Sequence, residues 1–344
     1  MNKGLEAILS YINGELKEEY SDFFYKYHPW LGDNGYIETS LDIGRENPDL
    51  MQVDFPTISL SKLQTPLIKL SAQRNAQAPT FLVTGLIHAR EFISGEVCLG
   101  IVESLIANYR NGDPLLQEGT WYFLPVVNPD GFSDNVQLVR KGKRFGSLYR
   151  GNMNGVDLNR NFADNFEQRS WTTKQRFSPE YAGVKAFSEL ETKFLKNLVE
   201  EIQPTAVINL HSFSNAILYP PWSSQENDEQ MELLAIRMSA AMEKPYAVVQ
   251  GSHFLEYAVE EATFPWLAKL ACKLRHPTVE GTFDGWLYQQ GIPSMLIEIS
   301  KPPLALALVS DLAGYNPPPS ELDFHKRNCS LAADRFFKDM IYGI

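Results

Sequence analysis

The sequence has few cysteines, no excess of basic residues and no long apolar run, and each shortage excludes a class of protein. Only three of its 344 residues are cysteine, and their odd number and wide spacing fit neither a disulfide framework nor a zinc knuckle. The net charge of −11 disfavours nucleic acid and anionic membranes as partners, because both attract a basic surface. No segment reaches the roughly 18 consecutive apolar residues of a membrane span. We therefore expect a globular protein with no nucleic-acid and no membrane partner.

The N-terminal residues also lack the pattern of a secretory signal. Residues 1–20 alternate apolar and charged side chains without a continuous apolar core. Together with the sparse cysteines, this predicts a reducing, cytoplasmic location. Residues 3–27 carry apolar side chains at helical spacing. We therefore predict an N-terminal helical extension, residues 1–34, that packs on one main domain, residues 35–344.

The rest of the chain has the composition and patterning of an α/β protein. Its content is 44% hydrophobic and 21% charged, which is ordinary for a globular domain. Apolar runs predict strands, and these alternate with segments of helical spacing, so helices should cover both faces of a sheet. The predicted strands are residues 66–71, 80–87, 120–127, 205–210 and 293–299, and the predicted helices are 94–107, 188–199, 228–242 and a last one from Ser320.

Three connecting segments carry sequence signals of their own. Asn128-Pro129-Asp130-Gly131 is typical of a turn. The segment 132–187 is polar and longer than a simple connection between two elements, which predicts a functional loop region. Ser188 and Glu191 have the spacing of a capping box at the start of a helix.

Ligand-type residues follow two of the predicted strands. His88 and Glu91 stand three positions apart where residues 80–87 give way to a helix, and His211 ends the strand 205–210. Ligands of open α/β sheets bind beyond the carboxyl ends of the strands. Two imidazoles and one carboxylate are typical of a catalytic zinc site, because three protein ligands leave a position for water. A single histidine of this kind is more often an ordinary core residue, so the prediction of one zinc ion rests on the three together.

Glu298 is a lone charged residue in the apolar strand 293–299. A carboxylate in such a strand must be compensated, either in a buried ion pair or at a functional site. Beside a zinc site it is a candidate general base.

Five motifs occur in the order of one known family: His88-Ala89-Arg90-Glu91, Asn128-Pro129-Asp130-Gly131, Asp157-Leu158-Asn159-Arg160-Asn161-Phe162, Leu210-His211-Ser212-Phe213 and Ile297-Glu298. Together they resemble the zinc carboxypeptidases, the family of pancreatic carboxypeptidase A, from roughly residue 35 to 335. The resemblance implies an α/β fold with a mixed, mostly parallel eight-stranded sheet between helices. It also implies hydrolysis of the C-terminal amide bond of a peptide substrate that has a free carboxylate.

The resemblance assigns roles to individual residues. His88, Glu91 and His211 match the zinc ligands, and Glu298 matches the base that activates water. Asn159 and Arg160 match the pair that binds the terminal carboxylate, which suits the planar fork of a guanidinium. Arg140 aligns with an arginine that stabilises the oxyanion, and Arg90 with a subsite arginine. The alternative for Arg140 and Arg90 is solvated surface charge.

Two positions depart from the family pattern. His276 stands where a mobile tyrosine is expected, and a structural loop histidine is an equally good interpretation. Asp284 aligns with the residue that tunes the specificity pocket, where it would favour a basic side chain; the alternative is a simple Asp-Gly turn.

Two other activities fit part of the pattern. A γ-D-glutamyl–diaminopimelate amidase of cell-wall peptides would use the same site, because diaminopimelate offers a carboxylate to Arg160 and an ammonium to Asp284. An aspartoacylase-type deacylase shares the metal ligands, but the Asn159-Arg160 pair and the 128–131 motif favour a peptidase.

Overall fold

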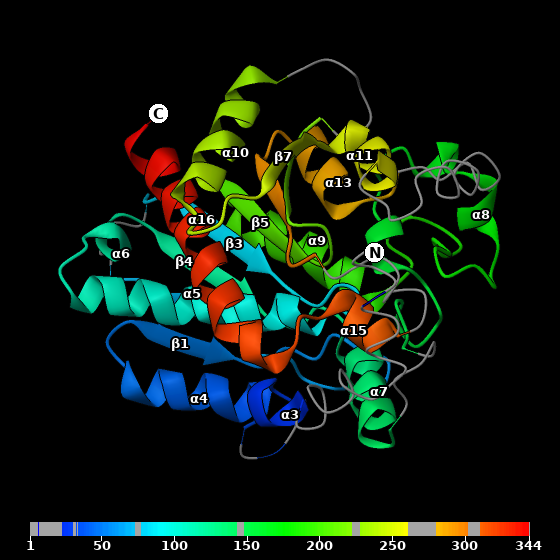
Figure 1. Ribbon diagram of the computed structural model, residues 1–344, viewed down its shortest axis with the longest axis horizontal. Coiled ribbons are helices and arrows are strands. Elements are labelled where there is room, and N and C mark those ends of the chain that lie inside the picture. The colour runs from blue at the N-terminus through cyan, green and yellow to red at the C-terminus, as the bar shows by residue number, and fades with distance from the viewer. Residues whose placement is uncertain are drawn as a thin grey trace.

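A single eight-stranded sheet forms the centre of the molecule, a computed structural model (Figure 1). The structure describes residues 6, 23–29, 32, 34–72, 77–142, 148–221, 228–260, 280–301 and 310–343. The strands are β1 (Met51–Asp54), β2 (Leu67–Leu70), β3 (Thr80–Thr84), β4 (Thr120–Leu124), β5 (Ala206–His211), β6 (Ala216–Tyr219), β7 (Ala247–Gln250) and β8 (Ser294–Glu298).

The order of the strands is β1-β2-β4-β3-β5-β8-β6-β7. Four neighbouring pairs are parallel: β3 with β4, β3 with β5, β5 with β8, and β6 with β7. The other three are antiparallel: β1 with β2, β2 with β4, and β6 with β8. The predicted mixed, mostly parallel eight-stranded sheet is therefore confirmed.

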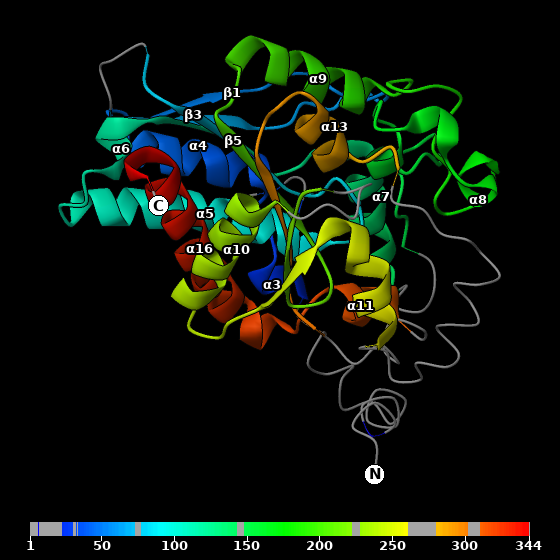
Figure 2. The same ribbon diagram turned by 90° about the horizontal axis from the view of Figure 1, so that it is seen from above.

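Helices cover both faces of this sheet, as Figure 2 shows. On one face lie α5 (Phe92–Arg110), α10 (Glu229–Ala241) and α16 (Leu322–Tyr342), which pack on each other and bury the larger core cluster. On the other face lie α9 (Leu190–Ile202) and α13 (Phe283–Gln289), over a smaller cluster. The remaining helices are α3 (Phe23–Lys26), α4 (Tyr36–Glu46), α6 (Leu115–Glu118), α7 (Pro129–Arg140), α8 (Trp171–Lys174), α11 (Phe254–Glu260) and α15 (Asp311–Tyr315).

Helix α5 is the core helix of the fold. Most of its residues are buried, including both faces of its first half, because the sheet lies on one side and α16 on the other. Of the described helices, α5 is the one that is long and apolar enough to cross a membrane. However, 72% of its most apolar 18-residue stretch is buried inside the protein. Its apolar character is explained by this burial.

Two glycines let β3 and α5 approach each other. A Cβ on Gly85 would lie 2.7 Å from the carbonyl oxygen of Ser94 and 2.9 Å from that of Pro125. A Cβ on Gly95 would lie 2.5 Å from the Tyr36 hydroxyl and 3.0 Å from the same Pro125 oxygen. Such contacts are shorter than van der Waals separations, so only glycine fits at these two positions.

The structure corrects several predicted elements. The 128–131 motif starts a helix: Asn128 caps α7 by accepting a hydrogen bond from the Gly131 amide. Ser188 does not cap α9, because its hydroxyl donates to the Glu189 carboxylate instead. Strands β1, β6 and β7 were not predicted, since each has only four residues and too few for a clear alternation.

The N-terminal prediction is tested only in its last part. Of residues 3–27, the structure describes residue 6, the helix α3 and Tyr27, and residues 3–5 and 7–22 lie outside the described part. Phe23 and Tyr27 are buried against the main domain. The boundary between 1–34 and 35–344 stays a prediction.

Candidate metal centre and active site

The carboxyl ends of β3, β5 and β8 bring the predicted ligands and base together. His211 and Glu298 are the last residues of β5 and β8. These strands are neighbours, and the two residues are partners in the parallel register. His88 follows β3 by four positions, and Glu91 is the residue before α5. Residues more than 200 positions apart thus meet at one edge, as the rule for open α/β sheets predicts.

Three donor atoms converge at this edge. The Nδ1 atoms of His88 and His211 are 3.1 Å apart. His88 Nδ1 lies 2.8 Å from Glu91 Oε1, and His211 Nδ1 lies 3.1 Å from Glu91 Oε2. All three side chains are buried. They form the one group of potential metal ligands found among the described residues.

These separations fit a zinc ion. Zinc binds imidazole nitrogen and carboxylate oxygen at about 2.0–2.2 Å, so ligand atoms on one ion lie about 3 Å apart, as they do here. His88 Nε2 lies 3.1 Å from Asp157 Oδ1. Its proton then belongs on Nε2, which leaves the Nδ1 lone pair for a metal, the usual outer-shell arrangement. Without a shared cation, too few protons would be present to form hydrogen bonds between all of these neighbouring nitrogen and oxygen atoms.

The electrostatics of Glu91 and Asp157 favour their charged forms. Burial alone would raise the pKa of Glu91, but the charges and hydrogen bonds of His88 and His211 outweigh it and lower that pKa. Burial likewise opposes ionisation of Asp157, and Arg150 together with His88 lowers its pKa well below the usual range. Both carboxylates are therefore anions suited to a cationic centre.

Arg150 is a functional residue that the sequence did not reveal. Its Nε donates to Asp157 Oδ2 at 2.8 Å, and its Nη1 lies 3.7 Å from Glu91 Oε1. The side chain is only 17% exposed. No sequence pattern distinguishes Arg150 from Arg140, Lys141, Lys143 and Arg144, which precede it in the same stretch of chain.

Arg140, in contrast, is not brought into this network. It ends α7, its side chain is exposed, and its guanidinium lies 5.5 Å from the centre of the Phe24 ring. The geometry favours Arg150 over Arg140 as the arginine beside the ligands.

Glu298 lies beside the ligands as a buried carboxyl. Burial, and then the Glu91 carboxylate, raises the pKa of Glu298 to about 8. Its Oε2 has no hydrogen-bond partner among the described residues. A buried oxygen without a partner is costly unless a ligand, water or ion meets it, so this atom is available to a reactant.

Asn159 and Arg160 lie next to the ligands on a 3₁₀ turn, Leu158–Arg160. The Asn159 amide nitrogen is 3.4 Å from His211 Nε2, and its oxygen accepts the Phe283 amide at 2.8 Å. Arg160 Nη1 donates to the Asn159 carbonyl, while its Nε is buried without a partner in the part of the chain that the structure describes. Arg160 thus retains donor capacity beside the centre.

Arg90 packs against helix α15. Its guanidinium lies 3.9 Å from the centre of the Tyr315 ring and donates to the Tyr315 hydroxyl at 2.6 Å. Asp311 Oδ1 is 3.7 Å away. Arg90 is therefore bound by Tyr315 and Asp311 of α15, and these long-range contacts cannot be read from the sequence.

Asp284 is not a free carboxylate at a pocket floor. It is fully buried, and its Oδ2 accepts from the Asn209 amide at 2.8 Å. The same amide nitrogen is 3.1 Å from His211 Nε2. Burial raises the pKa of Asp284. Asp284 thus contacts Asn209 behind the His211 ring, while its Oδ1 has no hydrogen-bond partner among the described residues. The role of Asp284 in the specificity pocket stays a prediction. His276, the other departure from the family pattern, lies outside the described residues.

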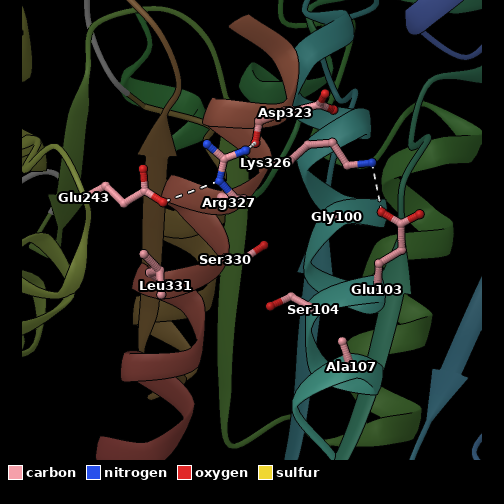
Figure 3. A pocket seen from close by; sticks show the side chains of 10 residues that line it. All are labelled: Gly100, Glu103, Ser104, Ala107, Glu243, Asp323, Lys326, Arg327, Ser330 and Leu331. Atoms are coloured by element: carbon pink, nitrogen blue, oxygen red, sulfur yellow. Dashed lines mark hydrogen bonds and ion pairs between the residues drawn. The ribbon is translucent and has the colours of Figure 1, made fainter. Parts of the chain in front are cut away.

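A surface groove of about 480 Å³ between α5 and α16 is separate from this centre (Figure 3). Its charged side chains pair with each other: Lys326 with Glu103 at 2.9 Å, and Arg327 with Glu243 at 3.4 Å. On α5 it begins at Gly100, roughly 14 Å along the helix from Glu91. The groove therefore does not belong to the metal centre.

Comparison with known proteins agrees with this geometry. The zinc carboxypeptidase family matches residues 37–328. Carboxypeptidase B of Helicoverpa zea is 27% identical over 271 residues, which cover 73% of this chain and 62% of that protein. Carboxypeptidase B2 of Rattus norvegicus is 26% identical over 288 residues, with 81% and 64% covered. The chain thus spans less than two thirds of the length of these relatives.

Solved structures share the fold. Thrombin-activatable fibrinolysis inhibitor superposes with a TM-score of 0.73 at 23% identity, covering 95% of this chain and 77% of that one. Carboxypeptidase A of Helicoverpa armigera gives a TM-score of 0.72 at 20% identity, with 93% and 75% covered. The family match includes the ligands His88, Glu91 and His211 and the carboxyl Glu298. By sequence, fold and metal-binding group, this chain belongs to the zinc carboxypeptidase family.

Proposed function

We propose that the protein is a zinc metallocarboxypeptidase that hydrolyses the C-terminal amide bond of peptides. The observation that carries this proposal is the juxtaposition of the three-donor group with Glu298, which faces His211 in the sheet register. A metal site with an adjacent buried carboxyl is the minimal equipment for metal-assisted amide hydrolysis.

His88, Glu91 and His211 would hold the zinc ion, which when bound polarises a carbonyl and lowers the pKa of water. Glu298 accepts a proton from the attacking water and passes it to the leaving amine as the C–N bond breaks. Its raised pKa favours proton uptake, and a cation held by the three ligands would draw it back toward the ionised, basic form.

Arg150 supplies a fixed positive charge beside Glu91. We propose that it, and not Arg140, stabilises the negative oxygen that develops on the scissile carbonyl. A preorganised donor of this kind contributes about 2.7–4 kcal/mol to catalysis.

Arg160 would bind the free carboxylate of the substrate, with Asn159 beside it. Support comes from the neighbouring Asn159, whose side-chain amide lies 3.4 Å from His211 Nε2, and from the buried Arg160 Nε, which has no hydrogen-bond partner among the described residues. Among the described residues no carboxylate forms an ion pair with Arg160, and such a guanidinium is suited to a substrate that brings a carboxylate. This requirement would make the enzyme an exopeptidase.

The burial of Asp284 affects the choice among substrates. Both the preference for basic residues and the γ-D-glutamyl–diaminopimelate alternative relied on this carboxylate facing a substrate cation. Asp284 Oδ2 is bound to Asn209 and only Oδ1 lacks a described partner, so the carboxylate gives no reason to prefer the cell-wall substrate over other peptides. The deacylase alternative is disfavoured by the family match over residues 37–328.

The test compares matched peptides with a free and an amidated C-terminus. We expect kcat/KM for the amidated peptide to fall by about 30- to 4000-fold, because loss of one partner of a desolvated charge pair costs about 2–5 kcal/mol. Arg160→Lys should narrow this difference. Arg169→Lys is the control, since Arg169 lies in the same loop but packs on Phe166. Equal rates for both peptides would contradict an exopeptidase, and a muropeptide in the same panel tests the cell-wall alternative.

A further inference from the structure

A short segment before the family match contacts the elements that carry the metal ligands. We propose that residues 23–29, called here the N-terminal brace, position Glu91, with Tyr27 and His28 as positioning residues. The inference rests on the proposed metal chemistry of the site. The brace precedes residues 37–328, which match the family.

The first contact of the brace is with helix α5. The His28 backbone amide donates to Glu96 Oε1 at 2.6 Å, and the His28 ring Nδ1 lies 2.7 Å from Glu96 Oε2. Glu96 is fully buried, one and a half turns after Glu91 along the chain. Tyr36 also donates to Glu96, at 3.0 Å. A buried carboxylate with three such donors is held firmly, and it holds the brace to the helix in return.

The second contact is made by aromatic rings. Phe23 stacks on Tyr27 with ring centres 4.0 Å apart, and its edge meets Phe92 at 5.4 Å. Phe24 meets the same Phe92 ring at 6.0 Å. Phe92 is the residue directly after the ligand Glu91, so the brace packs against the start of α5 where the ligand stands.

The third contact reaches the ligand from its other side. The Tyr27 hydroxyl donates to the Pro317 carbonyl at 2.8 Å. The neighbouring Asn316 donates its side-chain amide to the Arg90 carbonyl at 2.9 Å and accepts the Ile93 amide at 3.0 Å. Asn316 therefore bridges the backbone on both sides of Glu91, and Tyr27 fixes the loop from which Asn316 projects.

The same loop touches the second ligand strand. Ser212, which follows His211, donates to the Tyr315 carbonyl at 2.6 Å. Residues 315–317 are thus linked to both ligand-bearing elements and to the brace. A metal site depends on how precisely its ligands are held, and outer partners are known to tune affinity. These hydrogen bonds and ring contacts join the brace to the residues that hold the ligands in place, such as the loop of Asn316, and not to the ligands themselves.

The experiment measures the zinc dissociation constant of the full chain by competition with a chelator. Tyr27→Phe removes the hydrogen bond to Pro317 and keeps the ring stack on Phe23. His28→Leu removes the ring bond to Glu96, and His28→Asn restores it, since an asparagine amide nitrogen lies near the position of Nδ1. We expect the first two variants to bind zinc about 3- to 10-fold more weakly, less than the 10- to 100-fold effect of a direct outer partner. His28→Asn should return to within about 2-fold of wild type.

The controls lie at the opposite end of α5. Tyr109→Phe and Asp49→Asn, which breaks the exposed ion pair with Arg110, should leave zinc affinity unchanged. If Tyr27→Phe and His28→Leu lower thermal stability but bind zinc as wild type does, the brace only stabilises the fold and the inference is wrong. Should His28→Leu fail to fold, Tyr27→Phe decides.

Zinc affinity needs no catalytic turnover, so the two proposals fail separately. A wild type that binds zinc but hydrolyses no peptide would contradict the proposed function and leave the brace to be judged by affinity. In an active enzyme, the variants should lower kcat at saturating zinc more than they raise KM, because Glu91 holds the metal and not the substrate.

Discussion

His211 and Glu298 lie opposite each other on two neighbouring parallel strands, as register partners at the ends of β5 and β8. The sheet itself therefore fixes the spacing between a metal ligand and the candidate base. Side chains of register partners in a pair of neighbouring strands point to the same side. This relationship gives the first prediction.

Glu298→Gln should retain zinc and lose turnover. The amide keeps the size of the side chain but cannot accept a proton, and general-base catalysis contributes roughly 10²–10⁴-fold. We expect kcat to fall by at least this factor, measured with a peptide substrate at full zinc occupancy. Glu191→Gln, a buried carboxyl on α9, is the control and should keep normal kcat. Near-normal turnover of the Glu298 variant would exclude it as the base.

His211→Ala should lose about one equivalent of zinc. The imidazole is one of three ligands, and two remaining donors bind zinc far more weakly. Elemental analysis after dialysis gives the stoichiometry, and circular dichroism shows whether the fold persists. His325→Ala removes another buried histidine, one that faces Tyr246, and should leave zinc unchanged. Stoichiometric zinc in the His211 variant would refute the site.

Arg150→Gln and Arg140→Gln separate two candidate arginines. Arg150 lies 3.7 Å from a Glu91 oxygen, whereas Arg140 is exposed over Phe24. We expect kcat to fall about 10²–10³-fold for the first variant and to stay nearly unchanged for the second.

Because Arg150 also pairs with buried Asp157, the loss of one partner could unfold the protein. Arg150→Lys keeps the charge and serves as the folded comparison, with zinc content measured for each variant. The reverse ranking of Arg150 and Arg140 would restore the sequence-based assignment.

Glu191 should make stability fall as the pH rises. Burial raises its pKa to about 7, from 4.5. The folded state then binds more protons than the unfolded state between these values, so stability is present below pH 4.5 and is lost up to pH 7. The shift of about 2.5 units corresponds to roughly 3 kcal/mol. Denaturant unfolding of wild type and Glu191→Gln at pH 5 and pH 8 measures it. Parallel pH profiles of the two proteins would contradict the shift.

Asp284→Asn should not change the order of preference among substrates. Its carboxylate bonds to Asn209 behind His211, so any loss of kcat/KM should be equal for peptides ending in Arg, Lys, Phe and Leu. A loss confined to Arg and Lys peptides would show that the carboxylate does reach the substrate, as the alignment predicted.

The sequence predicted the ligand-bearing part of the fold better than the edges of the sheet. The strands that end at His211 and Glu298 are long apolar runs, whose burial is visible in composition. Strands β1, β6 and β7 have four residues each, too few for a clear pattern, and β6 in addition depends on pairing with β8, about 80 positions away in the chain.

Within the candidate site, too, some residues could be predicted from the sequence and others could not. Residues that bind a metal are recognisable by type, so His88, Glu91 and His211 could be found without coordinates. Arg150, Asn209 and Asn316 act through contacts across 7 to 226 positions, and no local pattern marks them. The contact of Asp284 with Asn209, across 75 positions, could not be read from the sequence for the same reason.

One last consequence concerns the narrow approach at Gly85 and Gly95. Both glycines lie against the same Pro125 carbonyl oxygen. A single backbone atom therefore limits how closely the two segments on either side of His88 and Glu91 can approach each other. A side chain at either glycine would press on this atom and push the two segments apart. Gly85→Ala and Gly95→Ala should therefore both displace His88 and Glu91, although the atoms that the added methyl groups would meet first belong to residues other than the metal ligands.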